Sequence, residues 1–147
     1  MTEREKVGRP VLLRCQHCHS LNRVDLARMH QHPKCAKCQA VFSLDRPQPV
    51  TDDDFPKVIE GASVPVLVDF YADWCGPCRA MAPALERFAA TRAGEVLVLK
   101  LDTEANPRSA ARYGIRGIPT LISFASGGEL RRHVGMADIG ALSGLVA

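Results

Sequence analysis

Six cysteines constrain this 147-residue chain more than any other feature of its sequence, because they form three Cys-x-x-Cys pairs. The pairs are Cys15/Cys18, Cys35/Cys38 and Cys75/Cys78. No apolar run of a secretory signal follows the charged N-terminus, so we expect a cytoplasmic protein. In such a reducing compartment, paired cysteines bind metal or carry out redox chemistry more often than they form structural disulfides.

The two early pairs have the spacing of a zinc ribbon, with sixteen residues between them. Each Cys-x-x-Cys turn places two thiolates on one side of a tight knuckle, and two knuckles complete a tetrahedron around Zn²⁺. Residues 11–44 are too few to build a sufficient core, and metal binding would supply the missing folding free energy. We predict one structural zinc ion with no open position for catalysis, held by Cys15, Cys18, Cys35 and Cys38.

Other uses of the early cysteines stay open at this point. The four cysteines could instead form two disulfides or a rubredoxin-like iron site. A histidine could also serve as a metal ligand, such as His17, which lies inside the first knuckle. Residues 1–50 carry a net charge of +5 and residues 51–147 a net charge of −2, which permits nucleic-acid binding by the first part. Phe42 is the one aromatic residue there, so base stacking has little support and we expect no nucleic-acid partner.

The sequence divides into two units. Residues 1–47 form the zinc-ribbon domain, with a charged, flexible tail at 1–10 and a linker at Asp45–Pro49. Residues 48–147 alternate helices and strands, which indicates an α/β fold with a central sheet flanked by helices. The expected helices are 55–60, 75–91, 105–113 and a short final one with Ile139, Leu142 and Leu145 on one face. The expected strands are 64–71, 95–101 and a hairpin of 120–124 and 129–134 that turns at Gly127-Gly128. No apolar run is long enough to cross a membrane, so we expect no membrane partner.

The third pair has a different setting, because it lies between a buried apolar strand and a helix. Cys75 at the helix N-terminus faces unpaired backbone N–H groups and the helix dipole, which stabilise a thiolate and lower its pKa. Pro77 suits the first helical turn because it donates no N–H. Cys78 lies one turn further in, where we expect it to be more buried than Cys75 and to act as the resolving thiol.

Residues 50–147 resemble the thioredoxin family. The motifs that match are Val68-Asp69-Phe70, Trp74-Cys75-Gly76-Pro77-Cys78, Pro83, Lys100, Tyr113-Gly114-Ile115-Arg116-Gly117-Ile118-Pro119-Thr120 and Gly135. With a four-cysteine ribbon in front, the whole chain is similar to the zinc-ribbon-containing thioredoxins of bacteria (thioredoxin 2 type). Two features depart from the family: Tyr71 stands where a tryptophan is common, and only twelve residues follow Gly135.

The resemblance implies a thioredoxin fold and a protein-disulfide reductase that binds no organic cofactor. Cys75 would attack a substrate disulfide and Cys78 would resolve the mixed disulfide, with thioredoxin reductase supplying electrons from NADPH. Asp69 would accept the proton of Cys78, Lys100 would pair with Asp69, and Pro119 would be a cis-proline facing the cysteines. The residues implied to frame the groove for a peptide substrate are Trp74, Gly76, Pro77, Gly117, Ile118 and Gly135.

Two other functions compete with reduction. The first is an oxidant or isomerase, against which Gly76-Pro77 between the cysteines and the absence of an export signal argue. The second is a zinc-dependent binding module in which the ribbon recruits a partner and the α/β unit is only a scaffold. An intact Cys75/Cys78 pair together with Asp69 argues against an inactive scaffold.

Overall fold

The structure is a computed structural model that describes residues 8–147. Two short strands and a 3-10 helix come first: β1 (Pro10–Arg14), β2 (Leu21–Asp25) and η1 (Leu26–Gln31). The helices that follow are α2 (Phe55–Gly61), α3 (Gly76–Thr91), α4 (Pro107–Arg112) and α5 (Ile139–Leu145). The strands that follow are β3 (Gln48–Pro49), β4 (Val66–Tyr71), β5 (Leu97–Asp102), β6 (Thr120–Ala125) and β7 (Gly128–Val134).

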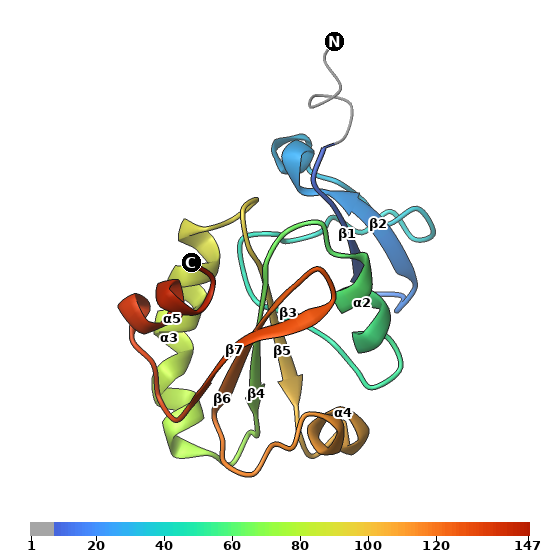
Figure 1. Cartoon of the computed structure of the whole chain (residues 1–147). Helices are drawn as coiled ribbons and strands as arrows, with labels where there is room; N and C mark the ends of the chain where they lie inside the picture. The colour runs from blue at the N-terminus through green and yellow to red at the C-terminus, as the bar shows by residue number, and fades with distance from the viewer. Residues whose placement is uncertain (1–7) are drawn as a thin grey trace.

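Five strands form one mixed sheet in the order β3-β5-β4-β6-β7. β3, β5 and β4 run parallel, β6 pairs antiparallel with β4, and β7 pairs antiparallel with β6. The central strand β4 is buried on both faces because helices cover both faces (Figure 1), and Asp69 is its one charged residue. Leu67 packs on one face with side chains of α3 and α5, and Val66, Val68 and Phe70 pack on the other with side chains of α2.

All helices and strands predicted for residues 50–147 are present, with ends shifted by a few residues. The hairpin turn lies at Ser126 and Gly127 rather than at Gly127-Gly128, and both of these residues have positive φ, as a type I′ turn requires. The predicted linker Asp45–Pro49 is partly wrong, because its last two residues form β3 and pair with β5. Propensity could not reveal β3: Pro49 disfavours a strand, and only an edge position tolerates it.

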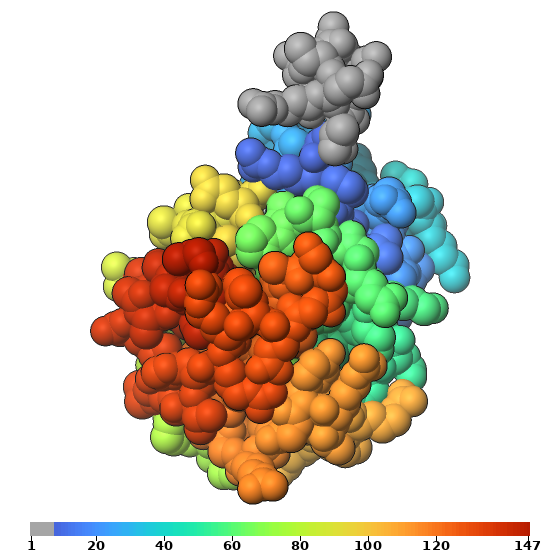
Figure 2. Space-filling model, viewed as in Figure 1, coloured from blue at the N-terminus to red at the C-terminus, as the bar shows by residue number. Residues whose placement is uncertain are grey.

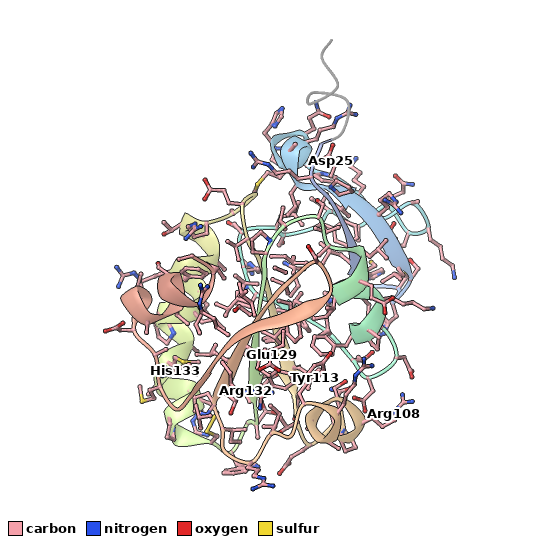
Figure 3. The ribbon with its side chains drawn as sticks, in the orientation of Figure 1. Asp25, Arg108, Tyr113, Glu129, Arg132 and His133 are labelled. Carbon is pink, nitrogen blue, oxygen red and sulfur yellow. A yellow bond between two sulfur atoms is a disulfide. The ribbon has the colours of Figure 1, made fainter. Side chains whose placement is uncertain are left out.

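The predicted tail at residues 1–10 lies mostly outside the described residues, but Pro10 belongs to β1. β1 and β2 form an antiparallel hairpin that begins the ribbon. Asp25 closes its open end by accepting hydrogen bonds from the backbone N–H groups of Arg9 (2.7 Å) and Ala27 (2.9 Å). Figure 3 places Asp25 at this end of the molecule and Arg108, on α4, at the opposite end.

The ribbon packs directly on α2, as the space-filling view shows (Figure 2). Arg14 of β1 pairs with Asp54 at the start of α2 (3.5 Å), and both side chains are largely buried. Leu12 packs so closely on Gly61 that a Cβ on this glycine would lie 2.6 Å from Cδ1 of Leu12. Apolar residues of the ribbon and of the α/β unit form one continuous core cluster that includes Val11, Leu13, Phe42, Phe55, Val58 and Ile59. The two units therefore share a core, although the predicted boundary between residues 47 and 48 stays a prediction.

None of the helices in residues 8–147 has the length and apolar character of a membrane span.

Candidate redox and metal sites

The third cysteine pair lies where β4 passes into α3. Cys75 is the N-cap of α3, with extended backbone (φ −80°, ψ 112°), and its Sγ accepts a hydrogen bond from the N–H of Cys78 (3.2 Å). Gly76 and Pro77 occupy the first turn of α3, where backbone N–H groups have no acceptor within the helix, so the missing N–H of proline costs no hydrogen bond. Cys75 and Cys78 form a disulfide. The strand–helix junction thus presents two sulfur atoms to the positive end of a 16-residue helix.

The predicted difference in burial between the two cysteines is wrong for this disulfide form. Cys75 is 3% exposed and Cys78 is 5% exposed, so both are buried. The loop before β6 covers Cys75, whose Sγ lies 3.7 Å from the carbonyl oxygen of Ile118. Sequence spacing placed Cys78 deeper along the helix, but it could not show a loop that lies about forty residues further along the chain. The asymmetry between the sulfurs is therefore one of surroundings rather than exposure.

Asp69 and Lys100 are neighbours across the sheet, because they are partners in the parallel register of β4 and β5. The predicted pairing of the two charges as an ion pair is wrong for this structure, because no salt bridge in residues 8–147 includes Lys100. Asp69 is 5% exposed, and its Oδ1 has no hydrogen-bond partner among the described residues. Burial raises the pKa of this carboxyl from 3.8 to about 7, and the positive charge of Lys100 opposes the rise. Asp69 is thus a buried carboxyl that can hold or release a proton near neutral pH.

A pocket of about 490 Å³ connects these groups. Cys78 and Arg79 of α3 line it on one side, and Asp69 and Lys100 line it from the sheet. Its outer wall includes residues 45–47, the segment that joins the ribbon to β3. Cys78 and Asp69 therefore share one pocket, to which the ribbon side of the chain contributes a wall that sequence analysis missed.

The loop that contains Ile118 and Pro119 lies against Cys75. The Ile118–Pro119 bond is cis, and the carbonyl oxygen of Pro119 accepts a hydrogen bond from the N–H of Gly135 (2.8 Å), which has φ 98°. Trp74, which precedes Cys75 in the chain, is 64% exposed, although its indole N–H donates to the carboxylate of Glu104 (2.5 Å). The exposed apolar side chains Val134 and Met136 flank Gly135. Sequence analysis missed Glu104, Val134 and Met136 as residues near the site. Two apolar residues on either side of Gly135 were a pattern that could have indicated Val134 and Met136.

The four early cysteines converge in the ribbon. Their Sγ atoms all lie within 4.8 Å of one another, with Cys15–Cys38 at 3.6 Å and Cys18–Cys35 at 3.5 Å. A tetrahedral site with Zn–S bonds of about 2.3 Å needs sulfur–sulfur distances of about 3.8 Å. The donor set therefore fits a zinc ion, and the histidines take no part in the cluster that the described residues form.

Polar groups on one side of this cluster favour a thiolate at Cys35, whereas the neighbouring thiols raise the pKa of Cys38. The Ser20 hydroxyl contacts the Sγ atoms of both Cys18 (3.1 Å) and Cys35 (3.3 Å). The Ser20 hydroxyl, the Cys38 backbone, the Asn22 amide and the Lys37 N–H together lower the pKa of Cys35 to about 5. Asn22 also accepts from the N–H of Ala36 (3.0 Å), which ties the second knuckle to β2.

The raised pKa of Asp69 predicts a pH-dependent stability for the oxidised protein. Between about pH 4 and 7 the folded state binds more protons than the unfolded state, so the free energy of unfolding falls as pH rises. The slope approaches about 1.4 kcal/mol per pH unit, and the free energy of unfolding falls by roughly 4 kcal/mol across this pH range. Urea unfolding from about pH 4.5 to 8 measures it, and Asp69→Asn is expected to remove this slope. The matched change at exposed Asp53 should leave the slope intact, and a slope that persists in Asp69→Asn contradicts the assignment.

Comparison with known proteins agrees with this geometry. The thioredoxin family model matches residues 46–147, and the model "Thioredoxin 2, N-terminal", a zinc ribbon, matches residues 14–40. Thioredoxin C-3 of Corynebacterium nephridii is 37% identical over 126 residues, covering 85% of this chain and 86% of that protein. Thioredoxin of Chlamydia muridarum is 47% identical over 100 residues, covering 68% and 95%. The solved structure of a mutant thioredoxin from Halobacterium salinarum NRC-1 superposes with a TM-score of 0.64 at 39% identity, covering 71% of this chain and 91% of that chain.

Cys75 and Cys78 form a disulfide at a helix N-terminus beside the central sheet, and the relatives of the chain are thioredoxins. Together these findings identify the chain as a protein-disulfide oxidoreductase. Its N-terminal unit is a zinc ribbon with four converging cysteines. The chain belongs to the thioredoxin family, whose model spans more than half of its length.

Proposed function

We propose that this protein reduces disulfide bonds in other proteins in the cytoplasm, with Cys75 as attacking thiol and Cys78 as resolving thiol. Thioredoxin reductase would return both cysteines to the reduced state. The observation that carries the proposal is the shared pocket of Cys78 and Asp69, because a carboxyl with a pKa near 7 beside a buried thiol can exchange its proton. A scaffold without redox activity has no use for that arrangement.

In the first step, the Cys75 thiolate attacks one sulfur of the substrate disulfide. A Cys75–substrate disulfide forms, and the other substrate sulfur leaves as a thiolate. The surface beside Ile118 and Pro119 would hold the substrate backbone in extended form, because the Ile118 carbonyl faces the dithiol. The exposed side chains of Trp74 and Val134 and the half-buried Gly117 and Gly135 would border the bound peptide, with Gly76 and Pro77 at the tip of α3.

In the second step, Cys78 attacks the Sγ of Cys75. Ionised Asp69 would take the proton of Cys78 through the pocket, and Lys100 would favour the ionised carboxylate. The substrate leaves with its second sulfur reduced, and Cys75 and Cys78 are left as a disulfide, the form in which this structure holds them. Two electrons have then passed from the protein to the substrate.

The ribbon would hold one structural zinc ion through Cys15, Cys18, Cys35 and Cys38. Bound zinc would cross-link the two knuckles and compensate for the small core of the ribbon. All four ligand positions come from the protein, so the site offers no place for a substrate.

A coupled assay tests the proposed function. NADPH, a bacterial thioredoxin reductase and this protein together should reduce insulin, with NADPH oxidation that depends on all three. Omitting the protein gives the background rate. The proposed reductase activity is contradicted if NADPH oxidation is no faster than that background and the protein also does not accelerate insulin reduction by dithiothreitol. If the protein accelerates the dithiothreitol reaction but not NADPH oxidation, only the proposed partner, thioredoxin reductase, is contradicted.

A further inference from the structure

The pocket beside Asp69 contains an aromatic side chain to which the proposed mechanism gives no role. Tyr71 lies two residues after Asp69 on β4, so both side chains project from the same face of the sheet. Lys100 is the register partner of Asp69 on β5, and all three residues line the pocket. The half-buried ring of Tyr71 therefore stands beside both charged groups of the proton-transfer site.

The Lys100 ammonium lies over this ring. Its Nζ lies 5.9 Å from the centroid of the Tyr71 ring, within the range of a cation–π contact. Within residues 8–147, Lys100 forms no ion pair with a carboxylate. Oδ1 of Asp69 has no hydrogen-bond partner there either. The charge of Lys100 thus acts on Asp69 at a distance, without a direct bond between the two side chains.

We propose that Tyr71 is a positioning residue for the proton transfer from Cys78: its ring holds the Lys100 ammonium over the pocket, where the positive charge favours ionised Asp69. The inference deepens the proposed reduction mechanism, in which ionised Asp69 is the proton acceptor. Without the ring, the flexible lysine side chain turns toward solvent, and less of the protein carries Asp69 in its ionised form at neutral pH.

Other charged groups face the pocket as well. Asp45 and Arg46 come from the segment before β3, Asp73 follows β4, and Arg79 and Glu86 come from α3. The side chains of Asp45 and Arg46 are 63% and 70% exposed and lie 3.9 Å apart, so water and their mutual pairing screen them. Arg79 donates to the backbone oxygen of Asp73 (2.6 Å). Lys100 is the cation that neighbours Asp69 across the sheet, which makes its position the one that matters most.

The test follows the side-chain carboxyl carbon of Asp69 by NMR as pH varies. The oxidised protein is used, because its disulfide-bonded cysteines do not titrate. Tyr71→Leu keeps an apolar side chain but removes the ring, and it should raise the pKa of Asp69 by about half a pH unit. Tyr71→Phe keeps the ring and should leave the pKa unchanged. Tyr113→Leu, at the only other tyrosine, should also leave it unchanged.

A double-variant cycle isolates the contact. Lys100→Met alone should raise the pKa, and Tyr71→Leu should add nothing in that background. An equal shift in both backgrounds, no shift, or a fall in pKa from water entry overturns the proposal. Tyr71→Met serves as a second ring-free variant should Tyr71→Leu fold poorly, which the fluorescence of Trp74, the one tryptophan, would reveal.

This experiment needs neither substrate nor reductase, so its failure is separable from failure of the proposed function. If the contact exists but the protein reduces no disulfides, the pKa shift remains and insulin reduction is absent. If the protein reduces disulfides but Tyr71 has no such role, insulin reduction by the wild type remains and the shift is absent.

Discussion

Cys75→Ser is expected to abolish the acceleration of insulin reduction by dithiothreitol, a loss of at least about 10³-fold in kcat/KM. A serine hydroxyl does not ionise near neutral pH and forms no mixed disulfide with the substrate. The N-cap position of this residue is kept, because serine is itself a favourable N-cap, so α3 should stay intact. The turbidity of precipitating insulin B chain measures the rate.

Cys78→Ser is the matched variant at the second sulfur. It retains the attacking thiol but cannot release the substrate, so one equivalent of mixed disulfide should accumulate on Cys75 without turnover. Mass spectrometry of the trapped species identifies the linked cysteine. Normal turnover by Cys75→Ser contradicts the assignment, and a trapped substrate on Cys78 in Cys75→Ser would reverse the two roles.

Removal of zinc is expected to destabilise the whole chain, not only the ribbon. Cys35→Ser removes a ligand that is fully buried in the continuous core cluster. Without the cross-link between knuckles, Val11, Leu13 and Phe42 lose their fixed packing against α2. We expect the free energy of unfolding to fall by several kcal/mol, which corresponds to a fall of roughly 10–20 °C in the midpoint of thermal unfolding.

Metal analysis and calorimetry check this prediction together. The freshly purified reduced protein should hold one zinc ion per chain, and Cys35→Ser should hold none. Cys75→Ser is the control, because it makes the same substitution outside the ribbon and should keep both the metal and the midpoint. A wild-type protein without zinc, or a Cys35→Ser variant with an unchanged midpoint, would show that the cluster does not depend on metal.

The two cysteine settings could be told apart from sequence because they depend on local chemistry. The spacing of the early pairs limits which thiolates can meet around one ion, and four Sγ atoms do converge in the ribbon. A buried apolar strand followed by Cys75 and Pro77 predicts a strand–helix junction, and β4 and α3 meet there. The motifs of residues 66–120 indicate the family without any knowledge of the fold, and the family model that matches residues 46–147 confirms it.

Several features of the site depended on segments that are distant in sequence. The loop at Ile118 buries Cys75 as deeply as Cys78, and Glu104 anchors the exposed Trp74. β3 exists because Gln48 and Pro49 find an edge position beside β5, which their own propensities do not predict. The contact between Tyr71 and Lys100 likewise joins two strands through register alone.

The amino-acid sequence alone determined the chemistry: four thiols for a metal, two thiols for electron transfer and a carboxyl within an apolar strand. Tertiary structure alone decided the environment of that chemistry, which includes the core shared by ribbon and α2, the wall of residues 45–47 around the pocket, and the burial of Cys75. The physical reason is that spacing and periodicity act over a few residues, whereas burial, and with it the pKa of Asp69, is set by whatever part of the chain packs there.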